Sequence, residues 1–135
     1  MNAHSGDASD DISVDLSDDE RQFLVWGLRV WGGLAYPSLG FMQSMGFSDG
    51  YALADFASDL GQKICRGERM SRTDWTLGLR LAEIGFASDI EGAGLEWQAS
   101  TGISDWESIT TLRSIQLKMI DVRIRYARPT GEPHG

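Results

Sequence analysis

Apolar residues recur at intervals of three and four along most of the chain, the spacing that places them on one face of an α-helix. The pattern is cleanest over residues 49–66. Five apolar residues there share one face: Leu53, Phe56, Ala57, Leu60 and Ile64. Charged and amide side chains occupy the opposite face: Asp55, Asp59, Gln62 and Lys63. Gly67 follows directly, and glycine often ends a helix because it tolerates the left-handed conformation, so we expect an amphipathic helix here.

Four further segments show helical spacing. We expect three long helices and one short helix, at residues 18–31, 72–90, 105–126 and 38–45 respectively. Gly32 and Gly33 end the first of them, and Gly46 ends the short one. Strand signals are absent from the pattern. The predicted fold is all-α, a single-domain compact bundle of four long helices plus one short helix.

A serine followed three residues later by a carboxylate precedes three of the long helices. The pairs are Ser17 with Glu20, Ser71 with Asp74, and Ser104 with Glu107. In such a capping box the serine hydroxyl accepts from the backbone N–H of the third helical residue, and the carboxylate accepts from the backbone N–H of the serine. We therefore expect helices to begin directly after Ser17, Ser71 and Ser104.

The helix predicted over residues 72–90 carries glycine at an interval of seven, at Gly78 and Gly85, with Gly92 just beyond it. Glycine inside a helix costs about 1 kcal/mol relative to alanine, so the stripe needs a reason. The simplest is a neighbouring helix that approaches closely. We expect this helix to be the central one of the bundle.

Length and composition fit one folded domain with polar ends. The chain has 135 residues, of which 41% are hydrophobic and 24% are charged. Residues 1–15 are acidic and rich in serine, which predicts a disordered N-terminal arm. Proline and glycine recur over residues 128–135, which predicts a flexible C-terminal tail. The helical bundle is expected over residues 16–127.

The net charge of −8 is unevenly distributed. Seven acidic residues and no lysine or arginine lie between Asp7 and Glu20, whereas five basic residues and one aspartate lie between Arg113 and Arg128. Binding to nucleic acid needs clustered lysine and arginine for the phosphates, so the overall charge argues against it. The acidity suits either solubility alone or attraction to a basic protein partner.

The inventory of reactive side chains is short. Cys65 is the single cysteine, which excludes a disulfide within the chain and fits a reducing compartment. No apolar run suggests a secretory leader or a membrane span, so we expect a cytoplasmic protein with no membrane contact. Both histidines, His4 and His134, lie in the predicted flexible ends, which argues against Ser-His catalysis, Cys-His catalysis and ordinary zinc sites.

Five residues near the end of the helix at 72–90 are candidates for a partner site or pocket: Asp89, Glu91, Glu96, Trp97 and Arg113. A helical wheel places Asp89 and Arg113 on inward faces of neighbouring helices, where they would form a partly buried ion pair. The pair could set the helix register, or Asp89 could be a functional carboxylate in a cleft. The three carboxylates lack a metal-site spacing, so we expect no metal and no cofactor.

Four of the five tryptophans lie on predicted helices, where we expect them in the core: Trp26, Trp31, Trp75 and Trp106. Trp97 lies instead in the long connection over residues 91–103, among glycines and carboxylates. It either closes the end of the bundle or anchors a protein partner.

Several short elements occur together: Trp-Gly-Gly at residues 31–33, Met-Gly-Phe at 45–47, Phe-Ala-Ser-Asp at 86–89 and Thr-Gly-Ile-Ser-Asp at 101–105. In these elements the chain resembles a group of small uncharacterised bacterial helical proteins, over about residues 17–120. The resemblance implies a shared fold. It carries no established activity, so no catalytic residue is assigned from it.

These observations favour a non-enzymatic protein that acts through protein–protein contact. In its most concrete form it is an acidic immunity-type neutraliser or regulator, whose acidic face and Trp97 connection cover a cationic site on a basic partner. One alternative is a small ligand-binding protein or enzyme with an end-of-bundle pocket around Asp89, Arg113 and Trp97. Another is a homodimer of structural role, formed by the broad apolar faces of the first and last helices.

Overall fold

The computed structural model describes residues 11–125, which form six α-helices and two short 3-10 turns. The α-helices are α2 (Asp18–Arg29), α3 (Leu39–Ser44), α4 (Gly50–Cys65), α5 (Arg72–Ala87), α6 (Trp97–Thr101) and α7 (Asp105–Lys118). The 3-10 turns are η1 (Val30–Gly32) and η2 (Gly94–Glu96). No strand forms within residues 11–125, and the predicted all-α single domain is confirmed. In the same part of the chain, no helix is both long enough and apolar enough to cross a membrane.

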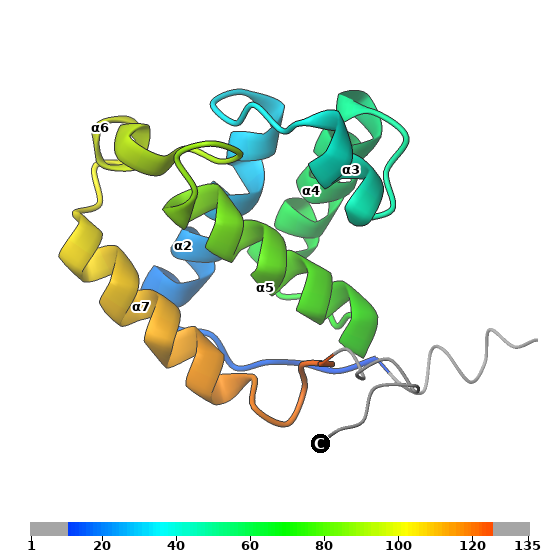
Figure 1. The fold of residues 1–135 in the computed structure, drawn as a ribbon. Helices are drawn as coiled ribbons and strands as arrows, with labels where there is room; N and C mark the ends of the chain where they lie inside the picture. The colour runs from blue at the N-terminus through cyan, green and yellow to red at the C-terminus, as the bar shows by residue number, and fades with distance from the viewer. Residues whose placement is uncertain (1–10, 126–135) are drawn as a thin grey trace, which may run out of the picture.

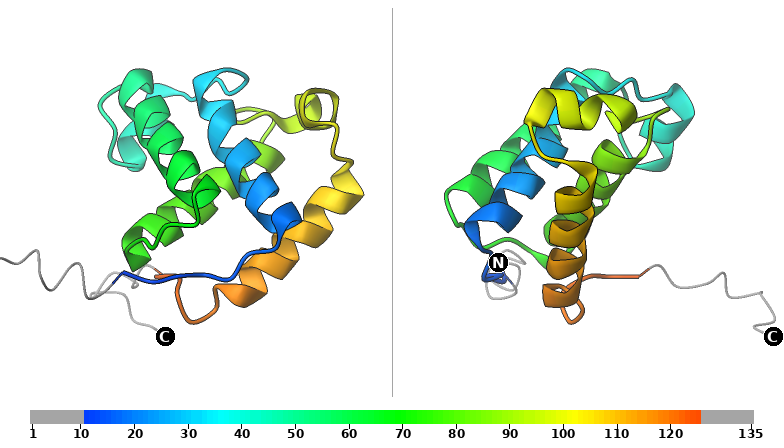
Figure 2. Two further views of the ribbon diagram at one scale, coloured as in Figure 1. Left: turned by 180° about the vertical axis from the view of Figure 1, so that it is seen from behind. Right: turned by 90° about the vertical axis from the view of Figure 1, so that its left-hand side faces the viewer.

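The three other long helices assemble around α2, which packs against α4, α5 and α7. Figure 1 shows α5 crossing in front of α2 and α4. Seen from behind, α2 lies between α4 and α7 (Figure 2). The prediction that the helix of the glycine stripe is central is therefore wrong, because α2 is the helix that has neighbours on several sides.

The crossing of α2 and α5 leaves no room for side chains between the two backbones. A Cβ atom on Gly85 would lie 2.6 Å from the carbonyl oxygen of Gly27, and one on Gly27 would lie 2.7 Å from Ala82 Cβ. The predicted close approach is thus confirmed at Gly85. Gly78 instead faces Leu60 Cδ1, which lies at an ordinary contact distance of 3.5 Å from a built Cβ.

Serine caps begin the helices as predicted. Glu20 N donates to Ser17 Oγ (3.1 Å), and Ser17 N donates to Glu20 Oε1 (2.8 Å), which completes the box before α2. The box before α7 is complete in the same way. At the start of α5, Asp74 N donates to Ser71 Oγ (3.1 Å) without the reciprocal bond. Aspartate is one methylene shorter than glutamate, which reduces its reach back to the serine.

Three tryptophans are buried in the core, and each indole N–H donates to an acceptor. The bonds run from Trp31 to Leu81 O (3.0 Å), from Trp75 to Ile12 O (2.9 Å) and from Trp97 to Ser108 Oγ (2.8 Å). The core prediction is confirmed for Trp31 and Trp75, while Trp26 is half-buried. It is wrong for Trp106, which is 78% exposed because α7 buries the face of Ser108, Leu112 and Ile115 instead.

α5 ends at Ala87, before the predicted end at residue 90. Ser88 adopts an extended conformation (φ −84°, ψ 120°), and the chain folds back so that Ala93 N donates to Gly85 O (2.7 Å). A Cβ atom on Gly92 would lie 2.7 Å from Gly85 Cα, so this glycine lets the returning chain pack against the end of α5.

α7 ends at Lys118, well before the predicted end at residue 126. Met119 is fully buried, and the chain turns there, with Val122 N donating to Met119 O (3.0 Å). Arg72 holds this turn, because its guanidinium donates to the carbonyl oxygens of Val122 (3.2 Å) and Asp121 (3.3 Å).

The disordered arm predicted over residues 1–15 is corrected at its C-terminal end. Ile12 forms an antiparallel bridge with Met70, with N–O distances of 2.7 and 3.0 Å. Lys118 Nζ donates to Asp15 O (2.7 Å). These bonds attach residues 11–15 to the bundle. Residues 1–10 and the predicted tail over residues 128–135 lie outside the described residues.

Candidate binding surface

Asp89 and Arg113 do not form the predicted ion pair. Both are exposed, and each has a different partner: Leu95 N donates to Asp89 Oδ1 (2.9 Å), while Arg113 Nη1 donates to Gln116 Oε1 (2.6 Å). The helical wheel fails for Asp89 because α5 has already ended at Ala87. The carboxylate instead fastens the connection that follows this helix.

The other two candidate carboxylates also lie apart. Glu91 binds the segment before α3, accepting from Ser38 N (2.6 Å) and Ser38 Oγ (3.0 Å). Glu96 is exposed at the start of α6 and makes no capping hydrogen bond there. In the part of the chain that the structure describes, no group of three histidine, cysteine, aspartate or glutamate residues could hold a metal ion.

Trp97 closes the end of the bundle, which was one of its two predicted roles. The connection over residues 91–103 is not irregular but contains η2 and α6, and α6 carries Trp97 into the core. Its ring lies 5.3 Å from that of Phe23 and 5.1 Å from that of Phe86, and it is fully buried. The other role, an anchor for a partner, is wrong for this residue.

Exposed apolar side chains gather elsewhere, on α7 and the two segments that flank it. Nine large hydrophobic residues are exposed in the described part of the chain, and six belong to this group: Ile90, Leu95, Trp106, Leu117, Ile120 and Ile124. The other three lie at or before the start of α4: Tyr36, Leu39 and Tyr51. Four of the six line two cavities beside α7: Leu95 and Trp106 line one, and Leu117 and Ile120 line the other, which makes this part of the surface a candidate binding site.

Two cavities of about 450 Å³ each lie between α5 and α7, the helices labelled at the front of Figure 1. The first, here called the Trp106 cavity, is lined by Phe86, Ala87, Asp89, Gly94, Leu95, Asp105, Trp106 and Ile109. The second, here called the Arg123 cavity, is lined by Leu79, Glu83, Arg113, Gln116, Leu117, Ile120, Arg123 and Arg125. Together they form the α5–α7 face.

Charge is segregated along the α5–α7 face. The charged residues of the Trp106 cavity are two aspartates, Asp89 and Asp105. The Arg123 cavity holds three arginines and one glutamate. Gln116 Nε2 donates to Glu83 Oε2 (2.6 Å) and so joins α7 to α5 within the Arg123 cavity. One end of the face is therefore acidic, and the other is basic.

A buried carboxylate fixes α7 against α2. Glu20 is 4% exposed, and it accepts hydrogen bonds from Lys118 Nζ (2.6 Å), from the Ser114 hydroxyl and from Ser17 N. Burial alone would raise the pKa of Glu20, but these hydrogen bonds and the charge of Lys118 outweigh burial and lower the pKa to about 2.

The sequence indicated only the capping role of Glu20. Ser114 and Lys118 are four residues apart and therefore share one face of α7, which is the available signal for the second role. That signal does not say which carboxylate the face meets, because Glu20 lies 94 residues from Ser114 in the sequence.

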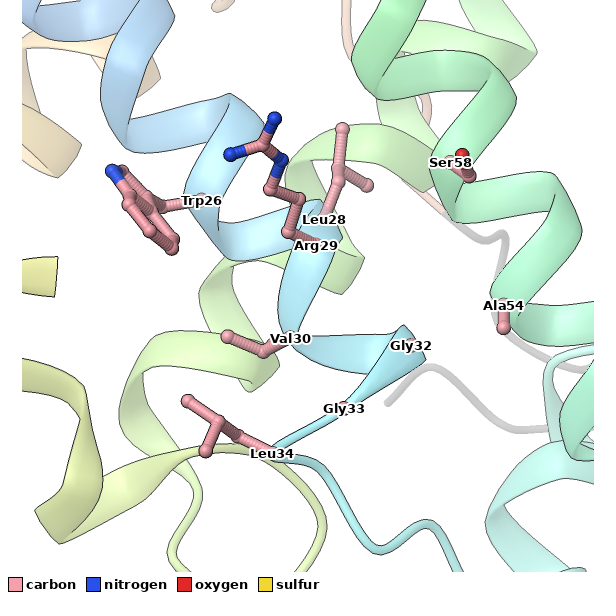
Figure 3. A pocket seen from close by; sticks show the side chains of 9 residues that line it. All are labelled: Trp26, Leu28, Arg29, Val30, Gly32, Gly33, Leu34, Ala54 and Ser58. Carbon is pink, nitrogen blue, oxygen red and sulfur yellow. The ribbon is translucent and has the colours of Figure 1, made fainter. Parts of the chain in front are cut away.

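A third cavity, of about 340 Å³, lies between the end of α2, η1 and α4 (Figure 3). Small residues border it on both sides, among them Gly32, Gly33, Ala54 and Ser58. Its charged residue is Arg29, whose guanidinium stands 5.5 Å from the ring centre of Trp26. No set of polar groups converges there, so this cavity is a weaker candidate than the α5–α7 face.

Comparison with known proteins adds no functional information, since no family model, curated protein or solved structure matches the chain. The resemblance to small bacterial helical proteins remains a prediction. The function is therefore inferred from the α5–α7 face.

Proposed function

We propose that this protein acts by binding another polypeptide through the α5–α7 face. Trp106 is the observation on which the proposal depends. It is 78% exposed at the rim of a cavity of about 450 Å³ that Phe86 and Ile109 also line. Tryptophan is strongly enriched among residues that dominate binding energy, and apolar surface exposed in one patch gains free energy when a partner covers it.

Trp106 takes the anchor role that the sequence suggested for Trp97. The surrounding groove between two helices suits an apolar helix or strand of a partner better than a flat contact. The pocket proposed around Asp89, Arg113 and Trp97 has no geometric support, because Asp89 and Arg113 line different cavities and Trp97 is buried.

An immunity-type neutraliser of a basic partner is one specific form of this proposal. Asp89 and Asp105 at the Trp106 cavity, together with the net charge of −8, support a cationic group on the partner at this end. The arginines of the Arg123 cavity favour an acidic group at the other end. A cytoplasmic location belongs to the same proposal, and Cys65, which is free and exposed, is compatible with a reducing compartment.

Affinity capture from the producing organism at low salt tests the proposal. Three tagged forms are used: the wild type, Trp106→Ser, and the matched control Tyr51→Ser, which alters an equally exposed aromatic on α4. We expect the wild type and Tyr51→Ser to capture the same polypeptide. Trp106→Ser should bind it about 30-fold more weakly, the effect of losing about 2 kcal/mol at a central anchor.

Circular dichroism should show the same helicity for all three proteins, because neither substituted side chain is buried. Equal capture of the partner by all three forms would contradict the proposal.

A further inference from the structure

We infer that the occupant of the α5–α7 face is a second copy of this chain, bound antiparallel about a two-fold axis between the two cavities. The inference rests on the proposed function, since it names the polypeptide that this face binds.

The order of charges along the face is the main reason. A two-fold axis brings the Trp106 cavity of one copy over the Arg123 cavity of the other. Asp89 and Asp105 then face Arg123 and Arg125 of the second copy, and the same contacts occur twice. An interface between identical chains must be complementary to itself, and a face with one acidic and one basic end meets this condition.

The helix α7 shows the same order by itself. Its first turn carries Asp105 and Glu107. Four basic residues follow along the helix and the turn after it, with the single aspartate Asp121 among them: Arg113, Lys118, Arg123 and Arg125. Two such segments attract when they run antiparallel. When they run parallel, like charges oppose each other, which selects the antiparallel arrangement.

The apolar residues follow the same symmetry. Each copy offers exposed side chains at both ends of the face, Trp106 and Leu95 at one and Leu117 and Ile120 at the other. Under the two-fold axis, Leu117 and Ile120 of one copy lie against the Trp106 cavity of the other.

The polar centre of the face is linked by hydrogen bonds within one copy. Gln116 donates to Glu83 Oε2 (2.6 Å) and accepts from Arg113 Nη1 (2.6 Å). Each of the three side chains thus has at least one partner within the face, which reduces the cost of covering them.

The net charge of −8 on each copy opposes association at long range. At 0.15 M salt the Debye length is about 8 Å, so charges dispersed over the two surfaces are largely screened from each other. The aspartates and arginines that face each other across the interface lie closer than this distance and are screened less. Their attraction therefore outweighs the repulsion between the net charges at this salt concentration.

Sedimentation equilibrium of the full chain at 0.15 M salt, from about 1 to about 100 µM, tests the inference. We expect the wild type to approach twice the 14.9 kDa of one chain. Asp105→Lys and Arg123→Glu should each weaken the dimer at least about tenfold, because each places like charges opposite each other twice. Asp55→Lys makes the same charge change as Asp105→Lys on an exposed position of α4 and should dimerise like the wild type.

Mixing the two weakened variants gives the sharpest result. In a two-fold dimer of Asp105→Lys with Arg123→Glu, the new lysine faces the new glutamate, and the unchanged aspartate faces the unchanged arginine. We expect the mixture to dimerise as the wild type does, and the double variant to dimerise with itself. A partner from another protein gives no such rescue.

A wild type that stays at 14.9 kDa throughout overturns the inference. So does a dimer that neither charge reversal weakens, or a mixture that shows no rescue. In each of these cases, capture of a different polypeptide by the wild type but not by Trp106→Ser leaves the proposed function standing. If the dimer is absent and Trp106→Ser captures the same polypeptides as the wild type, both the dimer inference and the proposed function are overturned.

Discussion

At the scale of single residues, Glu20 has the largest structural role that the sequence did not reveal. It serves as the carboxylate of a capping box and also as the buried partner of Lys118 and Ser114 on α7. A buried carboxylate is unfavourable on its own, so its stability depends on these donors. Because α7 carries Trp106, Glu20 also holds the α5–α7 face in position.

Glu20→Gln should lower the free energy of unfolding by about 3 kcal/mol, because it leaves the Lys118 ammonium without its carboxylate and disturbs a buried network. Urea unfolding followed by circular dichroism measures the change. Glu107→Gln is the matched control, since Glu107 has the same position in the box of α7 but is exposed. Glu107→Gln should lower the free energy of unfolding by about 1 kcal/mol or less. Equal losses in the two variants would show that capping alone accounts for Glu20.

The two exchanged tryptophan roles illustrate what a sequence pattern omits. Trp97 and Trp106 both follow the glycine-rich turn after α5, yet the first is fully buried and the second is 78% exposed. Apolar spacing indicates that a face will be covered, but another segment must supply the cover. Phe23 and Phe86 supply it for Trp97, whereas no packed aromatic ring covers Trp106 within the described residues.

At the scale of elements, α2 and α5 cross with their backbones in close contact. Gly85 was identified from the sequence as part of a stripe, but its partner Gly27 was not, because a single glycine in a helix has no periodicity. The contact depends on both residues, since each removes the Cβ atom that would collide with the other helix.

Gly85→Ala should destabilise the protein by about 2 kcal/mol or more, although alanine favours a helix by about 1 kcal/mol. The added Cβ would lie 2.6 Å from the carbonyl oxygen of Gly27, a backbone atom that moves only if the helices separate. Gly40→Ala on α3, where a Cβ meets nothing within 4 Å, is the control and should be neutral or stabilising. The measurement is the midpoint of thermal unfolding of each variant. Equal midpoints for Gly85→Ala and Gly40→Ala would refute a close crossing.

The starts of the helices were predicted more accurately than their ends. A start is set by a serine and the backbone N–H three residues later, so the whole signal lies within four residues. The ends of α5 and α7 depend on distant contacts. Arg72 binds the carbonyl oxygens after α7, and the returning chain at Ala93 bonds the last turn of α5.

At the scale of the whole molecule, acid should weaken the fold through its carboxylates. The pKa of Glu20 is lowered from 4.5 to about 2 in the folded state. A lowered pKa means that the unfolded chain binds the proton first, so the stability from Glu20 is fully present above about pH 5 and disappears between about pH 5 and pH 2. Burial, together with Asp11 and Asp59, raises the pKa of Asp74 against the charge of Lys63, so this group acts in the opposite sense.

Urea midpoints of the wild type and Glu20→Gln, measured from pH 7 to pH 2, test this expectation. The two proteins should differ most at pH 7 and converge as the pH approaches 2. A constant difference across this range would show that Glu20 does not titrate with a lowered pKa.

The whole molecule also separates stability from binding. Glu20, Gly85 and Trp97 lie on contacts of α2 with its neighbours, while the α5–α7 face is formed by residues of α5, of α7 and of the segments after them. Variants of the face should therefore change association while leaving the unfolding midpoint of the monomer, measured at a protein concentration too low for dimerisation, unchanged.

The sequence by itself determined the fold class, the starts of the helices and the charge asymmetry. It also pointed to the segment after α5 as the region of a candidate site. Each of these follows from composition or from contacts within about four residues. The tertiary structure decided which tryptophan is covered, which carboxylates have partners, and where α5 and α7 end. Those outcomes depend on segments tens of residues apart that meet only after folding, as Glu20 meets Lys118 and Gly27 meets Gly85. Burial is a property of the packed neighbours, and no local pattern specifies them.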